Sequence, residues 1–271
     1  MITGGYVLGH SDRELERLST QARVIGPITR EFFTEAGIAR GMRILEVGSG
    51  SGDVAVMAAE LVGDQGLVVG VDRAPAAIEA ARRRVEGLSL NNVSFREGDP
   101  AEITFDDSFD AAVGRYVLLF QADVAGLLRR LARWVRPGGM IVFHEPDWST
   151  ARSVPPAPTY DRCCRWLIEA ARRGSSDWTI GDKLHAAFVS AGLRAPTMRM
   201  RTFVSGGAEV REWLQAVAEL AETLLPAMEE FGVATAAEVE LATLVERMTR
   251  EVAQNNSVIF GRSEIGAWSR V

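Results

Sequence analysis

The hydrophobic residues between positions 42 and 145 follow two alternating patterns. Short apolar runs of strand length recur, and the stretches between them place apolar residues at helical spacing. The predicted strands cover residues 43–47, 66–72, 93–98, 109–114 and 140–145. The predicted helices begin near residues 52, 75 and 124. This alternation predicts an α/β fold with a parallel, doubly wound sheet.

A helical pattern also precedes the first predicted strand. Residues 1–36 are expected to form an N-terminal helical cap, because apolar residues recur at helical spacing after Ser11. Two interpretations of this cap stay open. In the first, the cap packs on the core or supplies a homodimer surface. In the second, it closes as a lid in which Tyr6, His10 or Gln21 covers a bound ligand.

After Pro146 the alternation of strands and helices stops. Three prolines predict a loop over residues 147–158, and helical spacing follows in several stretches up to residue 254. We therefore expect a single domain with helical additions near its C-terminus. Its predicted parts are a cap (1–36), a core (37–145) and helical lid insertions over the substrate (146–192 and 206–256), all within residues 1–271.

Three alternating glycines follow the first predicted strand. Gly48, Gly50 and Gly52 lie between that strand and a helix, so a ligand can approach the backbone and meet amide groups at the helix start. Dinucleotide-binding folds need Gly-x-Gly-x-x-Gly, and that spacing fails because Asp53 occupies the third glycine position. Glu46 is unusual in an apolar strand, since an ionised side chain there must find a partner.

Two acids follow the next two predicted strands. Asp72 lies 20 residues after Gly52, where a carboxylate can accept both ribose hydroxyls of an adenosine that rests on the glycine turn. Asp99 is placed to accept the exocyclic amine of adenine. Together with the turn at residues 137–139, Pro-Gly-Gly, these features resemble the class I S-adenosylmethionine-dependent methyltransferases over residues 36–145. Within that family, the chain is most similar to the ubiquinone/menaquinone-type and small-molecule natural-product enzymes.

The resemblance implies a fold and a cofactor. The fold is a seven-stranded, mostly parallel, Rossmann-like sheet that ends in an antiparallel hairpin, for which residues 193–204 and 265–271 are the candidates. The cofactor is S-adenosyl-L-methionine, and its product is S-adenosyl-L-homocysteine. The implied cofactor-binding residues are Glu46, Gly48, Ser49, Gly50, Gly52, Asp72, Arg73, Gly98, Asp99, Pro100 and Arg115.

The resemblance also implies a role for most of these residues. The glycine turn contacts the methionine and ribose portions, and Glu46 faces the cofactor's ammonium directly or through water. Asp72 binds the ribose, Arg73 lies beside the adenine, and residues 98–100 surround the base. Arg115 is placed near the cofactor's carboxylate, although a surface ion pair is the alternative for this side chain.

The chemistry of a sulfonium donor limits what the protein must supply. Methyl transfer is an in-line displacement, so alignment and a dry pocket come first, and a base is needed only when the acceptor loses a proton. His144, at the end of the last predicted strand, is the candidate base, and a hydrogen-bonded structural imidazole is the alternative. Glu145 either binds the acceptor or caps a helix.

The acceptor is expected to be a small, partly apolar molecule. The candidate acceptor-binding residues are Tyr6, Glu145, Trp148 and Trp178. For the tryptophans, simple packing of the added helices is the alternative. A second functional interpretation is a non-catalytic protein on the same fold that binds S-adenosylmethionine or S-adenosylhomocysteine.

The composition of the chain limits the classes of partner that we expect. A net charge of −6 argues against a nucleic-acid partner, and no uncharged apolar run approaches the roughly 20 residues of a membrane span. The first residues lack a basic-then-apolar signal pattern, so we expect a cytoplasmic protein. The only cysteines, Cys163 and Cys164, are adjacent and point in different directions on a helix, so neither a disulfide nor a metal site is predicted.

Overall fold

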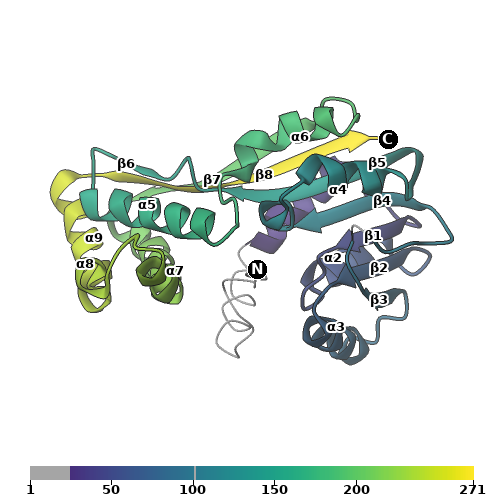
Figure 1. Cartoon of the computed structure of the whole chain (residues 1–271), viewed down its shortest axis with the longest axis horizontal. Helices are drawn as coiled ribbons and strands as arrows, with labels where there is room; N and C mark the ends of the chain where they lie inside the picture. The colour runs from purple at the N-terminus through teal and green to yellow at the C-terminus, as the bar shows by residue number, and fades with distance from the viewer. Residues whose placement is uncertain (1–24, 101) are drawn as a thin grey trace. The chain divides into compact units, whose positions relative to one another are not determined.

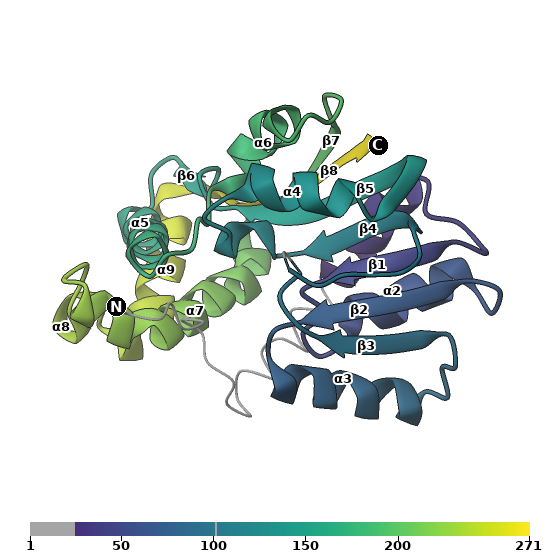
Figure 2. The same cartoon turned by 45° about the vertical axis from the view of Figure 1, so that its right-hand side comes forward.

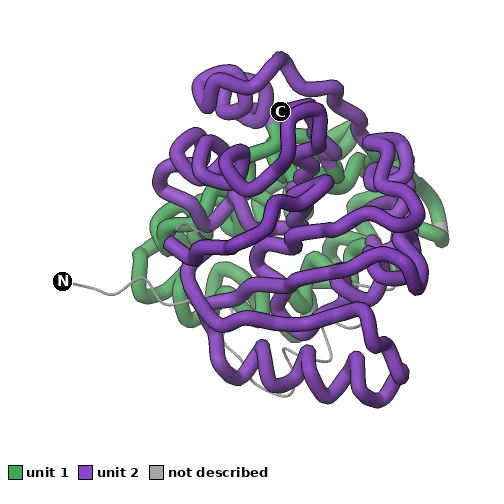
Figure 3. The backbone as a smooth tube through the Cα atoms, turned by 90° about the vertical axis from the view of Figure 1, so that its right-hand side faces the viewer, with its two compact units in different colours: residues 1–17, 146–181, 201–264 green, residues 18–145, 182–200, 265–271 purple. Residues whose placement is uncertain are grey.

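The computed structural model describes residues 25–100 and 102–271, and they form two compact units (Figures 1 and 3). We call residues 25–145, 182–200 and 265–271 the core unit, and residues 146–181 and 201–264 the helical unit. Tyr6, His10 and Gln21 lie outside the described residues. The division of the chain into one domain with lid insertions stays a prediction.

The core unit contains a parallel sheet. Its strands are β1 (Arg43–Val47), β2 (Leu67–Asp72), β3 (Val93–Glu97), β4 (Phe109–Arg115) and β5 (Val135–Asp147), the last of which ends two residues into the helical unit. The strand order is β3-β2-β1-β4-β5, and every neighbouring pair is parallel (Figure 2). The order therefore reverses between β1 and β4, and in such sheets ligands bind outside the carboxyl ends of the strands at this point.

The core unit contains a helix over residues 25–35, α2 (Asp53–Val62), α3 (Pro75–Gly87), the short 3-10 helix η1 (Leu118–Phe120), α4 (Val124–Ala132) and α6 (Leu184–Ser190). Of these helices, α2, α3 and α4 connect strands of the sheet, as the hydrophobic pattern predicts. A further 3-10 helix, η2 (Ile180–Lys183), precedes α6. Fully buried side chains from the helices and strands, among them Phe32, Ile44 and Ala58, form one apolar cluster. This cluster packs the helices against the sheet.

The helical unit consists of three long helices and a short sheet. Its elements are β6 (Arg152–Val154), α5 (Pro158–Arg173), η3 (Gly207–Val210), α7 (Arg211–Glu230), α8 (Ala236–Val239) and α9 (Leu241–Asn255), together with parts of β7 (Thr197–Gly206) and β8 (Val258–Arg270). Helices α5, α7 and α9 pack against one another. Among the described helices, none combines the length and apolar character that a membrane crossing requires.

The α/β prediction is confirmed, with one correction. The sheet has eight strands among the described residues, where seven were expected. The additional strand is β6, which pairs antiparallel with β8 inside the stretch predicted as a loop. Arg152 lies over the Phe260 ring at 4.2 Å, and this contact helps to hold the pair. A three-residue strand between prolines is too short to show alternation in the sequence.

Candidate functional site

The glycine turn lies at the carboxyl end of β1, beside the point where the strand order reverses. Gly48 and Gly50 both adopt left-handed backbone conformations, with φ of 67° and 50°. A Cβ on Gly48 would lie only 2.7 Å from a methyl carbon of Val117, so packing excludes a side chain there. A Cβ on Gly50 would meet nothing within 4 Å. The backbone at Gly50 therefore faces open space in which a ligand can lie.

Asp72 is held against this turn by backbone amides. One carboxylate oxygen accepts a hydrogen bond from the Gly50 N–H at 2.8 Å, and the other accepts from the Ala74 N–H at 2.9 Å. The Gly48 and Ser49 amides donate to the carbonyl of Val71, which ties the turn to β2. Because each carboxylate oxygen has two lone pairs, Asp72 keeps acceptor capacity toward a ligand. These hydrogen bonds hold the Asp72 carboxylate at the place predicted for a ribose.

Two polar atoms near the turn are buried without a hydrogen-bond partner among the described residues. They are Oε2 of Glu46 and Oγ of Ser49, on side chains that are 1% and 5% exposed. Burial raises the pKa of Glu46 from 4.5 to about 8, Arg115 opposes this rise, and Asp72 adds to it. An unsatisfied carboxyl costs folding free energy unless a ligand binds it. A cationic ligand beside Glu46 would supply the missing hydrogen-bond donor and favour the ionised carboxylate.

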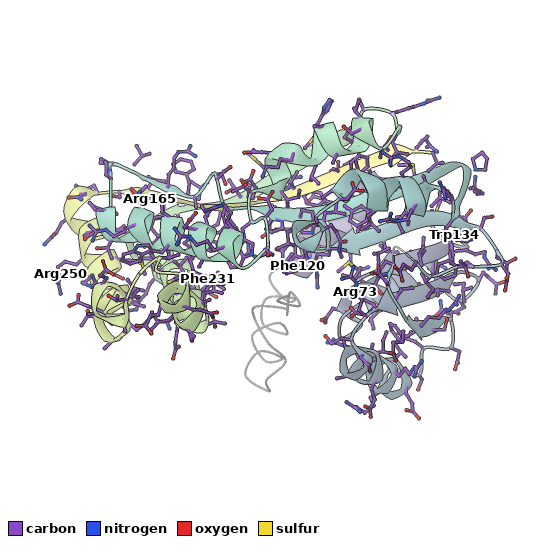
Figure 4. The ribbon with its side chains drawn as sticks, in the orientation of Figure 1. Arg73, Phe120, Trp134, Arg165, Phe231 and Arg250 are labelled. Atoms are coloured by element: carbon purple, nitrogen blue, oxygen red, sulfur yellow. The ribbon has the colours of Figure 1, made fainter. Side chains whose placement is uncertain are left out.

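The residues predicted to surround a base lie at the ends of β2 and β3. Arg73, labelled in Figure 4, forms an ion pair with Asp99 at 3.0 Å, and both side chains are partly exposed. The Gly98 N–H donates to the Asp72 carbonyl at 2.9 Å, and Pro100 is buried. Asp72, Gly98 and Asp99 are thus brought together as predicted. A ligand amine at Asp99 would share this carboxylate with Arg73.

His144 is fully buried in the core unit. Its Nδ1 lies 3.0 Å from Oγ1 of Thr29, and its ring meets the rings of Phe32 and Tyr116 edge to face, at centroid distances of 5.0 and 5.6 Å. Arg115 donates to the same Thr29 oxygen at 3.4 Å. Thr29 therefore joins the candidate base to the arginine beside Glu46.

Thr29 was not among the residues predicted for the site. The signal that could have revealed it is a polar residue on an apolar helix face, four residues after Ile25 and three before Phe32, all of them buried.

Glu145 caps a helix, as one of its two interpretations predicts. Its carboxylate accepts hydrogen bonds from the Val117, Leu118 and Leu119 amides at 2.9, 2.8 and 3.4 Å. These amides open η1 and lack partners within the helix. A role of Glu145 in acceptor binding stays a prediction, and such a role would compete with these bonds.

The tryptophans proposed for acceptor binding belong to an aromatic stack in the helical unit. Trp178, Trp148, Trp213 and Phe203 follow one another at centroid distances of 5.7, 6.1 and 5.4 Å. Trp148 and Trp178 are only 3% and 7% exposed. The Trp213 indole donates to the Tyr160 hydroxyl at 3.1 Å. The stack therefore packs the unit's helices and strands together, as the packing alternative describes, while acceptor contact stays a prediction.

No cluster of His, Cys, Asp or Glu side chains in residues 25–100 and 102–271 is arranged to hold a metal ion. Cys163 and Cys164 are buried thiols that form no disulfide, and burial raises the pKa of Cys163 to about 12.

Comparison with known sequences identifies relatives of this chain. Residues 38–192 match a family described as "Methyltransferase domain". The chain is 38% identical over 125 residues to aklanonic acid methyltransferase DauC of Streptomyces sp. (strain C5), an alignment that covers 43% of this chain and 57% of that protein. It is 37% identical over 136 residues to 2-phytyl-1,4-naphtoquinone methyltransferase of Synechococcus elongatus, which covers 48% and 57%. The alignments thus span just over half the length of these relatives.

Solved structures show the same fold. Geranyl diphosphate C-methyltransferase from Streptomyces coelicolor A3(2) superposes with a TM-score of 0.57 at 18% identity, over 98% of this chain and 88% of that one. The glycine turn, Asp72 and the carboxyl ends of the strands lie within the segment that the family match covers. The chain belongs to the methyltransferase-domain family.

Proposed function

We propose that this protein transfers a methyl group from S-adenosylmethionine to a small, partly apolar acceptor and releases S-adenosylhomocysteine. One observation carries the proposal. A buried carboxyl with an unsatisfied oxygen, Glu46, lies beside a glycine turn that opens to a ligand and is bonded to Asp72. An amino-acid ammonium and an adenosine ribose are the groups that such a pair of acids accepts.

The residues of the site fit this cofactor. Glu46 and Ser49 would bind the ammonium with atoms that lack partners among the described residues. Asp72 would bind the ribose hydroxyls with its remaining lone pairs. Asp99 and Arg73 would lie beside the adenine. Arg115, whose charge already acts on Glu46, would attract the cofactor's carboxylate. The bound cofactor supplies an activated methyl group on a sulfonium.

The protein's remaining task is alignment and proton transfer. His144 would accept a proton from an acceptor whose oxygen, nitrogen or carbon must be deprotonated. The burial of His144 keeps bulk water away from that ring. The names of the relatives, which specify aklanonic acid and a naphthoquinone, support a small-molecule acceptor.

Location and assembly form part of the same proposal. The proposed protein is cytoplasmic and acts as a homodimer on a free metabolite, without a membrane partner. The net charge of −6 argues against a nucleic-acid partner. Cell fractionation and light scattering of the purified protein test these statements.

The function itself is tested in two stages. Calorimetry should show that S-adenosylmethionine and S-adenosylhomocysteine bind while nicotinamide dinucleotides do not. Transfer of a labelled methyl group to a panel of hydroxylated quinones and other small aromatic acceptors should follow. Binding without transfer to any acceptor would favour the non-catalytic alternative, and no binding would refute both.

A further inference from the structure

We propose that Arg84 is a positioning residue that holds the glycine turn in its ligand-binding conformation; the consequence for cofactor affinity rests on the proposed function. Three consecutive arginines, Arg82, Arg83 and Arg84, lie on α3, and each contacts a different part of the molecule. Arg82 donates to the Phe95 carbonyl in β3, and Arg83 forms a surface ion pair within α3. Arg84 instead reaches back across 33 positions to the glycine turn.

The Arg84 guanidinium contacts two groups where the turn joins α2. Its Nη1 donates to the Ser51 carbonyl at 3.3 Å and lies 2.7 Å from Oδ1 of Asp53, the first residue of α2. The Ser51 hydroxyl donates to the other Asp53 oxygen at 3.1 Å. The Arg84 and Asp53 side chains are 37% and 18% exposed, so water screens this pair less than a fully exposed one. Arg84 therefore ties the end of the turn to α3.

The same face of α3 also packs on the turn through Ala81. Ala81 lies three residues before Arg84, a spacing that places two side chains on one face of a helix, and it is fully buried. A Cβ on Gly52 would lie 3.1 Å from the Ala81 Cβ, so the helix contacts the Gly52 backbone directly. Ala81 thus limits movement of the turn toward α3, while the Arg84 contacts oppose movement away from it.

This restraint matters because the turn is rich in glycine. Glycine loses more conformational freedom than other residues when it is ordered, and Gly50 and Gly52 both adopt left-handed conformations, with φ of 50° and 84°. Ligand affinity falls in proportion to the fraction of molecules whose turn has the binding conformation. Arg84 bonds to neither of the unpartnered polar atoms, on Glu46 and Ser49. It acts on them through the conformation of the backbone between them and α2.

Hydrogen exchange of the full-length protein, read by mass spectrometry, tests the positioning role without any ligand. Arg84→Met keeps most of the aliphatic stem and removes the guanidinium. We expect amides of residues 48–56 to exchange about 3- to 30-fold faster in this variant, because the turn opens more often. Arg83→Met is the matched control, since its ion pair with Glu79 lies on the surface, with side chains 65% and 70% exposed. It should leave exchange in residues 48–56 unchanged.

Calorimetry tests the consequence for the proposed cofactor. Arg84→Met should bind S-adenosylmethionine and S-adenosylhomocysteine about 3- to 30-fold more weakly, and by the same factor, because the turn serves groups that both ligands share. Arg84→Lys, which keeps the charge, should restore part of the affinity. A charge effect of the released Asp53 would instead favour the sulfonium ligand over its neutral product. A merely structural role would lower the melting temperature without changing the affinity of the folded protein.

Three outcomes would overturn the proposal: native exchange rates in residues 48–56 of a folded Arg84→Met protein, an equal loss of affinity in Arg83→Met, or a change confined to the sulfonium ligand. If Arg84→Met does not fold, Asp53→Asn removes the charge that Arg84 binds. That variant should show the same faster exchange, and native exchange in it would equally overturn the proposal. Failure of the proposed function is distinguishable, because neither ligand would then bind the native protein while the exchange difference between the variants remained.

Discussion

Glu46 provides the most quantitative prediction from this structure. Its carboxyl is 1% exposed and its pKa is raised by burial from 4.5 to about 8. Between these two pH values the folded protein holds a proton that the unfolded chain has released, so folding becomes less favourable as pH rises. At 1.36 kcal/mol per pKa unit, the cost grows by about 2.5 kcal/mol between pH 5 and pH 7 and levels off above pH 8.

The variant Glu46→Gln removes this titration and keeps the size of the side chain. We therefore expect its stability relative to the native protein to increase by about 2.5 kcal/mol between pH 5 and pH 7. Urea unfolding at closely spaced pH values measures the difference, and the pH dependence separates it from any constant effect of the amide. Glu79→Gln is the matched control for the change of a carboxyl to an amide, because its side chain is 70% exposed.

The same variant should lose cofactor binding while it gains stability. An amide, unlike the carboxyl, cannot give up a proton and become charged when an ammonium binds beside it. We therefore expect S-adenosylmethionine to bind about 10- to 150-fold more weakly, which corresponds to about 1.5–3 kcal/mol for a charge-assisted bond. Calorimetry on folded protein measures this. A pH-independent stability difference together with unchanged affinity would refute the reasoning about Glu46 on both counts.

Three further substitutions separate the other roles in the site. Asp72→Ala should weaken S-adenosylhomocysteine binding about 10- to 150-fold by calorimetry, and unchanged affinity would reject the ribose assignment. His144→Ala should lower turnover about 10²- to 10⁴-fold with cofactor affinity intact, whereas normal turnover would assign the ring a structural role. Glu145→Ala should destabilise the fold by about 1–3 kcal/mol in urea unfolding, because the Val117 and Leu118 amides lose their acceptor. Native stability in that variant would contradict the capping role.

The parts of the fold that the sequence predicts are those set by local signals. The strand before the glycine turn, the turn itself and α2 follow from apolar runs and glycine spacing between residues 43 and 62. Pro75 begins α3 as its fixed backbone angle leads one to expect. The pairing of Asp72 with the turn is also foreseeable, because the ends of adjacent parallel strands must meet.

The missed features depend on contacts between distant residues. Thr29 reaches His144 across 115 positions, and no local pattern specifies that bond. Likewise, β8 begins at Val258 rather than near residue 265, because its first residues pair with β6. From the sequence, the charge of Glu46 was expected to need a partner. In the structure, burial instead favours the neutral form of this carboxyl.

The central claim is that an amino acid and an adenosine bind together across the glycine turn. A crystal structure of the protein with S-adenosylhomocysteine tests it most directly. We predict the ligand's ammonium within hydrogen-bonding distance of Glu46, its ribose hydroxyls on Asp72, and its backbone contacts at Gly50. A ligand bound elsewhere, or a turn that stays empty at saturating concentration, would contradict the assignment.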